Sequence, residues 1–175
     1  MKNILVAIAI VLALRADGQK QEGQTCLFAC MNHVDPRKSV DDYIRDFNQF
    51  TGSRQDVYSD GAAGTTKELA QFIKSEFDTE DLKKTTIMHA IDSGYSIISI
   101  VQPRHWSCMS AMHVIVLQGY HSSDLNDPFN TELVFYDPET GSNTERVTLA
   151  EFTAKWQVYA LGVKRKVNGS VQGKP

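Results

Sequence analysis

The chain has 175 residues, 42% of them hydrophobic, and its 18 lysine and arginine residues against 21 aspartate and glutamate residues give a net charge of −3. This composition is that of an ordinary globular protein, and at roughly 150 residues per domain the length indicates one domain. With only three cysteines, a disulfide scaffold is excluded. The slightly acidic balance supplies no basic field for phosphates, so we expect no nucleic-acid partner.

The first 16 residues have the organisation of a secretory signal peptide. A cationic start precedes the apolar run 4–14, which is too short for a transmembrane helix, because such a helix needs about 20 apolar residues. Ala16 is the expected last residue before cleavage, with Ala13 as the alternative; an uncleaved anchor or a buried first strand are the other interpretations. Cleavage would leave a secreted or periplasmic protein with no membrane association.

We expect residues 17–167 to form a single domain followed by a flexible polar tail, 168–175, because no repeat or proline-rich linker divides the chain. Helices are predicted from apolar spacing and from start and stop signals. They are, in chain order, a buried helix over 25–34, one opened by Ser39 and Asp42, one opened by Thr65 and Glu68 that continues to Phe77, and one over 79–92.

The apolar pattern changes after Gly94, which ends the last of these helices. Strands are predicted at 95–101, 112–120, 132–136 and 157–166, with loops between them. Thr148 and Glu151 form a capping-box pattern for a short helix that continues to Trp156. Helices followed by an antiparallel sheet with one inserted helix make an α+β fold.

Three residues at the ends of predicted elements could together perform thiol catalysis, which needs a thiolate, an imidazole and a group that orients the imidazole. Cys26 begins the first helix, where unpaired N–H groups and the helix dipole favour a thiolate. Cys30, one turn later in an apolar stretch, is expected to be inert. His113 precedes a buried strand, and Asp137 ends the next strand, from which its carboxylate can reach the Nδ1 side of a neighbouring histidine.

The order of these residues resembles that of papain-like cysteine peptidases, especially the compact bacterial branch that includes bacteriocin-processing double-glycine peptidases and secreted effector proteases. The matching segments are Thr25-Cys26-Leu-Phe-Ala-Cys30, Gly94-Tyr-Ser-Ile-Ile, His113-Val-Ile-Val-Leu, Asp137-Pro-Glu-Thr-Gly141 and the closing segment 151–156. The resemblance implies a papain-like fold in which a helical N-terminal half, with the cysteine on its central helix, packs on a C-terminal antiparallel sheet. It also implies Cys26 as nucleophile, His113 as general base and acid, and Asp137 as the orienting residue.

The resemblance also implies a glutamine that donates to the oxyanion. The family usually has this glutamine six residues before the nucleophile, where this chain has Lys20, with Gln19 and Gln21 on either side. We assign the role to Gln21. Gln24 stands six residues before Cys30 and would fit the alternative in which Cys30 is the nucleophile.

The expected activity is hydrolysis of a peptide or isopeptide bond through an acyl-enzyme, by a monomer that acts on a protein or peptide without a cofactor. Acyl transfer, as in transglutaminase-like enzymes with the same Cys-His-Asp order, is one alternative. A non-catalytic binding module is another, because Leu27 stands where the family commonly has tryptophan. Cys30 and Cys108 could pair in an oxidising compartment or stay buried, and either outcome leaves Cys26 free.

Zinc binding is the competing interpretation of the cysteines and histidines. Two sets contain suitable ligands: Cys26, Cys30 and His33, and His105, Cys108 and His113. Neither has the tight Cys-x2-Cys spacing, so we expect no metal site. The remaining histidines are expected to have no chemical role: His33, His105 and His121 are solvated or capping residues, and His89 is partly buried in a helix. The loops 52–64, 102–110 and 121–130 are expected to border the cleft.

Overall fold

The computed structural model describes residues 25–52, 65–82, 87–101, 113–124, 126–127 and 129–166. Its helices are α1 (Cys26–Val34), α2 (Val40–Thr51), α4 (Thr66–Glu76), α5 (Ile87–Asp92) and α6 (Leu149–Glu151), and a π-helical turn, η1 (Phe152–Trp156), continues α6. Its strands are β1 (Phe77–Glu80), β2 (Ser96–Val101), β3 (His113–Ser122), β4 (Thr131–Asp137), β5 (Ser142–Thr148) and β6 (Gln157–Arg165). The predicted signal peptide, Gln19, Gln21 and Gln24, the loop 102–110 and the tail 168–175 lie outside the described residues.

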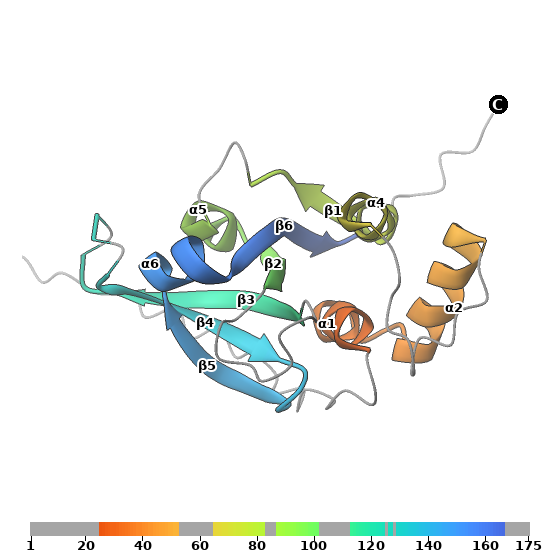
Figure 1. Ribbon diagram of the computed structural model, residues 1–175, viewed down its shortest axis with the longest axis horizontal. Coiled ribbons are helices and arrows are strands. Elements are labelled where there is room, and N and C mark those ends of the chain that lie inside the picture. Colours follow the sequence, from red (N-terminus) through yellow and green to blue (C-terminus); the bar gives the residue numbers. More distant parts are fainter. Residues whose placement is uncertain are drawn as a thin grey trace, which may run out of the picture.

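The strands form one antiparallel sheet in the order β1-β6-β2-β3-β4-β5. Figure 1 shows α1, α2 and α4 at one end of the molecule and α5 and α6 at the other. Alternate residues of the strands face two separate apolar clusters, as the pleat of a strand requires. Ile98 and Val114 pack with α1, α2 and α4, whereas Ile97 and Ile115 pack with α5 and η1. The predicted α+β fold is confirmed.

Local sequence signals set the helix starts. Ser39 and Asp42 form a reciprocal capping box at α2, and Thr65 and Glu68 form another at α4. Each box satisfies backbone N–H groups that have no acceptor within the helix. The predicted starts of both helices are therefore confirmed, and α1 ends before Asp35-Pro36 as expected.

The predicted helix over 79–92 is wrong in its first part. Residues 77–80 form β1, an edge strand in which Phe77 pairs with Arg165 of β6, and the helix α5 starts only at Ile87. β1 has only four residues, which is too short for a clear strand pattern in the sequence. Its extended conformation depends more on pairing with β6, which is distant in the chain, than on its own β-propensity.

The edge strand β5 was also missed, because its polar, partly exposed residues lack the apolar alternation of a buried strand. The predicted strands within the sheet agree with β2, β3, β4 and β6 to within about two residues, the usual scatter of boundaries. In the predicted helix that starts after Thr148, the last turn is the π-helical η1. Within the described ranges, no helix combines the length and hydropathy needed to span a membrane.

Candidate active site

Cys26 is the first residue of α1, as the sequence predicts. Its neighbours Leu27 and Phe28 are buried in the core, which fixes the helix against the sheet, while Cys26 itself is half-buried. The first turn closes where the N–H of Ala29 donates to the carbonyl of Thr25 at 3.0 Å. The Cys26 thiol is free and lies at the N-terminus of the helix, the positive end of its dipole.

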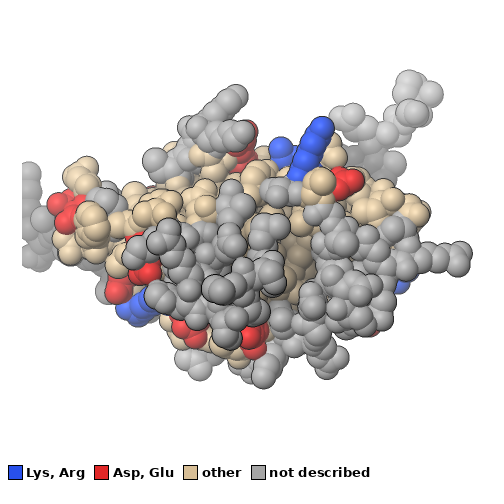
Figure 2. All heavy atoms as spheres, viewed as in Figure 1, with Lys and Arg blue, Asp and Glu red and all other residues tan. Residues whose placement is uncertain are grey.

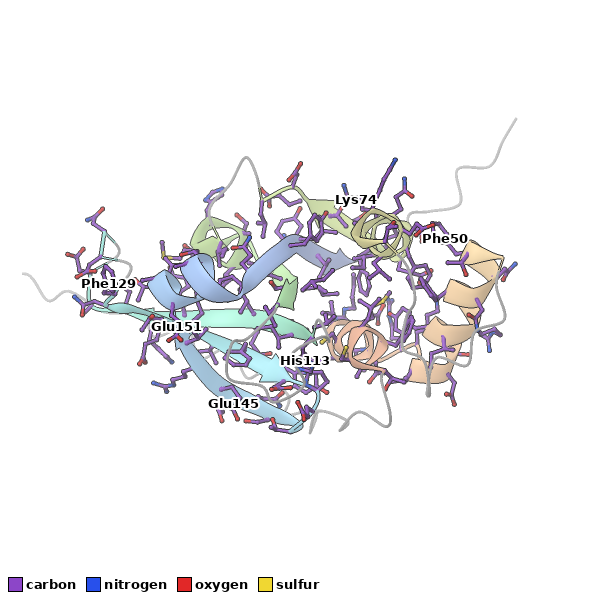
Figure 3. All side chains as sticks on the ribbon, in the orientation of Figure 1. Phe50, Lys74, His113, Phe129, Glu145 and Glu151 are labelled. Atoms are coloured by element: carbon purple, nitrogen blue, oxygen red, sulfur yellow. The ribbon has the colours of Figure 1, made fainter. Side chains whose placement is uncertain are left out.

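His113 and Asp137 meet at one end of the sheet. β3 and β4 are antiparallel, with Val116 opposite Tyr136, so the start of β3 lies beside the end of β4. His113 Nε2 and Asp137 Oδ1 are 2.9 Å apart, and the two residues are only 6% and 5% exposed. Figure 3 shows His113 beside α1.

The expected contact between His113 and Asp137 is present, but through the other ring nitrogen. The sequence argument placed the carboxylate on Nδ1, whereas the structure places it on Nε2. Strand order determines which residues meet, and only the side-chain rotamer determines which ring nitrogen is used. With Nε2 bonded to Asp137, Nδ1 is the nitrogen left for the hydrogen bond with Cys26.

The turn after β4 fixes the Asp137 carboxylate. The N–H of Glu139 donates to Asp137 Oδ1 at 2.9 Å, and the N–H of Gly141 donates to the Asp137 carbonyl, also at 2.9 Å. Gly141 has a φ of 70°, in the left-handed region that glycine adopts without a steric penalty. This glycine therefore closes the turn that holds the carboxylate on the imidazole.

The electrostatics favour a charged imidazole. Burial alone would lower the pKa of His113, but hydrogen bonds with Asp137 and Cys26, together with the charges of both groups, raise the pKa to about 9. The ring is therefore an imidazolium at neutral pH. A thiolate beside an imidazolium is the arrangement from which a cysteine can attack a carbonyl carbon.

Cys30 has the opposite environment. It is fully buried, and its Sγ donates to the Val114 carbonyl at 3.2 Å. Burial, followed by the charges of Cys26 and Asp137, raises the pKa of its thiol well above the ordinary value. The structure therefore disfavours the alternative with Cys30 as nucleophile, and Cys30 is unpaired here. Cys108 lies outside the described residues.

Two of the histidine expectations are wrong. His33 is not solvated: its ring stacks on Tyr136 at a centroid distance of 4.1 Å, and its Nε2 lies 2.9 Å from Gln118 Oε1. His89 is exposed instead of partly buried, because α5 packs against the core through Ile87, Ala90 and Ile91. His121 is exposed, as expected, although it lies within β3.

The one group of described residues with a geometry suited to a metal ion differs from the zinc sets considered from the sequence. It consists of His113, Asp137 and Glu139, whose ligand atoms lie within 4.8 Å of one another. Its two buried members already bond to each other. Sequence reasoning missed Glu139, although the turn signal Asp-Pro-Glu-Thr-Gly places this residue two positions after the orienting carboxylate.

Comparisons with known proteins identify a family and a similar fold. The model of the Peptidase_C39 like family matches residues 11–161. A solved structure, the peptidase domain of Streptococcus ComA, described as a bi-functional ABC transporter involved in a quorum-sensing pathway, aligns with a TM-score of 0.50 at 14% identity. The alignment covers 84% of this chain and 97% of that domain.

At this level of identity, the likeness to the ComA domain concerns the fold alone. No curated protein sequence matches the chain significantly. The family model, however, spans most of the chain, including α1, β3 and β4 with the residues that meet at the end of the sheet. The chain therefore belongs to the Peptidase_C39 like family of cysteine peptidases.

Proposed function

We propose that the protein hydrolyses a peptide or isopeptide bond through an acyl-enzyme on Cys26. The observation that carries this proposal is the position of His113, which bonds to Asp137 through one side of its ring and to Cys26 through a second hydrogen bond. A base that is oriented by a carboxylate and lies within reach of a thiol is the minimal apparatus for nucleophilic thiol catalysis.

In the first half of the reaction, the Cys26 thiolate attacks the carbonyl carbon of the substrate. The carbon–nitrogen bond breaks, and His113 gives its proton to the leaving nitrogen. In the second half, His113 takes a proton from water while the water oxygen attacks the thioester. The carbon–sulfur bond breaks, which releases the acid and restores the Cys26 thiolate beside the imidazolium. Asp137 holds the ring throughout and stabilises its charged form.

The developing oxyanion needs hydrogen-bond donors. The backbone N–H of Cys26, at the N-terminus of α1, has no acceptor within the helix and is one candidate. The side-chain amide of Gln21 is the other, and we retain it as a proposal from the sequence. A Gln21→Ala variant that labels normally with iodoacetamide but hydrolyses peptides more slowly would support this role.

The proposal includes a location. The apolar start of the chain supports removal of residues 1–16 and secretion, or export to a periplasm. We retain the expectation that the protein is a monomer. Sequencing the N-terminus of the protein recovered from the medium or periplasm tests the cleavage, and an intact Met1 on membrane-bound protein would contradict it.

The test of the nucleophile is selective alkylation. The native protein is treated with limiting iodoacetamide at neutral pH, digested, and each cysteine adduct is quantified by mass spectrometry. We expect Cys26 to react first and the buried Cys30 only after unfolding. His113→Ala should slow the labelling of Cys26. Equal labelling of all cysteines, or none at Cys26, would contradict the proposal.

The mass of the products shows whether water or an amine accepts the acyl group from Cys26. A peptide that the enzyme cleaves is incubated with and without an added primary amine. Hydrolysis yields the free acid in both cases, whereas acyl transfer yields the amide when the amine is present. A purely binding protein yields neither product.

A further inference from the structure

A second carboxylate stands beside the site and has no role in the reaction described above. Glu139 lies in the turn after β4, and its carboxylate is within 4.8 Å of the ligand atoms of His113 and Asp137. His113 and Asp137 are buried, whereas Glu139 is exposed. The Glu139 carboxylate is therefore the solvent-exposed member of this group, and a peptide bound at His113 can approach it.

The turn geometry fixes the position of Glu139. Its own N–H donates to Asp137 Oδ1, so the backbone of Glu139 is tied to the carboxylate that orients His113. The Thr140 hydroxyl and the Gly141 N–H both donate to the Asp137 carbonyl, at 3.4 and 2.9 Å. These hydrogen bonds fix the backbone of Glu139 relative to Asp137, and therefore relative to the imidazole that Asp137 orients.

The charge of Glu139 is not balanced within the described part of the chain. The ion pairs there join lysine and arginine residues to other carboxylates, and Asp137 pairs with His113. Glu139 belongs to none of these pairs, although both acidic and basic side chains are visible on the face of the molecule in Figure 2.

The chemistry of the proposed reaction determines which part of the substrate lies near Glu139. The acyl half of the substrate becomes bonded to Cys26, whereas the leaving nitrogen must lie at His113, which protonates it. The residue that follows the cleaved bond begins at that nitrogen. A group within 4.8 Å of the imidazole therefore borders the leaving side of the substrate.

We propose that Glu139 is a specificity-determining residue that selects peptides with lysine or arginine directly after the cleaved bond. This inference rests on the proposed function. A cation at this position would otherwise meet only the positive imidazolium, and Glu139 supplies the opposite charge. An acidic residue there would face the Glu139 carboxylate and be disfavoured. Because exposed ion pairs are weak, we expect a preference of about two- to fivefold.

The experiment uses a proteome-derived peptide library with blocked N-termini. New N-termini created by the enzyme are identified by mass spectrometry and show which residue followed each cleaved bond. A cleaved sequence is then synthesised in two forms, with lysine or with glutamate after the bond, and kcat/KM is measured for both. Their ratio within one enzyme does not depend on how much of that enzyme is active.

Glu139→Gln and Glu139→Lys are compared with a matched pair, Asp78→Asn and Asp78→Lys, at an exposed carboxylate on β1, the opposite edge strand of the sheet. The lysine-to-glutamate ratio should fall towards one in Glu139→Gln, reverse in Glu139→Lys, and stay at the wild-type value in both Asp78 variants. Raising the salt concentration should reduce the wild-type ratio.

A wild-type ratio near one, or a ratio that Glu139→Lys leaves unchanged, overturns the inference while the peptidase activity stands. Equal changes in the Asp78 and Glu139 variants also overturn it, because they would show an effect of net charge. If no peptide is cleaved and Cys26 does not react with iodoacetamide, the proposed function itself fails, and this inference fails with it.

Discussion

Two histidines lie where α1 meets the sheet, and their environments differ in one respect. His113, at the start of the helix, has a carboxylate and a thiol as partners, and its pKa rises to about 9. His33, at the other end of α1, has the ring of Tyr136 and the neutral amide of Gln118. Burial lowers the pKa of His33, and the hydrogen bond with Gln118 offsets this only in part. The chemistry of the partner, more than burial, decides which histidine carries a charge.

The two cysteines of α1 repeat this contrast over one turn of helix. Cys26 is half-buried and faces the imidazole, whereas Cys30 is fully buried in the core and donates a hydrogen bond to a backbone carbonyl. The two ends of α1 therefore have different roles, with chemistry at the start and anchoring further along. His33 belongs to the anchoring end, because its stack on Tyr136 and its bond to Gln118 join α1 to both β4 and β3.

The largest effect on activity is expected when each of the two cysteines of α1 is replaced separately by alanine. Cys26→Ala should reduce kcat by at least about 10⁴-fold, because the nucleophile and its base act as a unit. The matched variant, Cys30→Ala, should keep the activity and lose only about 1 kcal/mol of unfolding free energy. Peptide cleavage and urea unfolding measure the two quantities. Loss of activity in Cys30→Ala with normal stability would reverse the assignment.

A smaller effect is expected from Asp137→Asn, which keeps an acceptor for Nε2 but removes the charge. The rate should fall roughly 10²-fold. Since the imidazolium is the acid that protonates the leaving group, kcat/KM of the wild type should decline as the pH rises through about 9, the pKa of His113. In the variant this decline should move to lower pH. The same midpoint in both proteins would show that Asp137 does not set the charge of His113.

The raised pKa of His113 also has a consequence for stability. A base whose pKa is higher in the folded than in the unfolded protein stabilises the fold fully below its unfolded value, 6.5, and loses this effect as the pH rises to about 9. The melting temperature should therefore decline across this interval, and His113→Gln should decline less. Parallel curves for the two proteins would contradict the linkage.

The smallest effect is expected at His33, where the sign is opposite. Its lowered pKa keeps the folded ring neutral, so the unfolded chain binds more protons and stability falls as the pH drops below the ordinary value of 6.5. His33→Phe keeps a ring against Tyr136 and cannot be protonated. Its urea midpoint should therefore depend less on pH between 7 and 5 than that of the wild type. An equal pH dependence of the urea midpoint in the two proteins would show that protonation of His33 does not cause the loss of stability at low pH.

Features that depend on neighbouring residues were predictable from the sequence. The capping boxes at Ser39 and Thr65 set helix starts through bonds that span three residues. The apolar runs of β2 and β3 are continuous enough to identify buried strands. The chain order Cys26, His113, Asp137, with each residue at the end of an element, led to the candidate site before any distance was known.

Other features depended on partners distant in the chain and could not be predicted. β1 is a strand because β6 pairs with it, and β5 is a strand because β4 does. The stacked, half-buried position of His33 required Tyr136, more than a hundred residues later.

By itself, the sequence determined the α+β class, the starts of the capped helices α2 and α4, and the order of the site residues, because caps and apolar periodicity act over one or two turns of chain. Only the tertiary structure decided that Asp137 bonds to Nε2 instead of Nδ1, that Cys30 is sealed away from the site, and that Glu139 stands beside the imidazole. Each of these depends on strand register, rotamers and exclusion of water, which arise only when distant segments pack together.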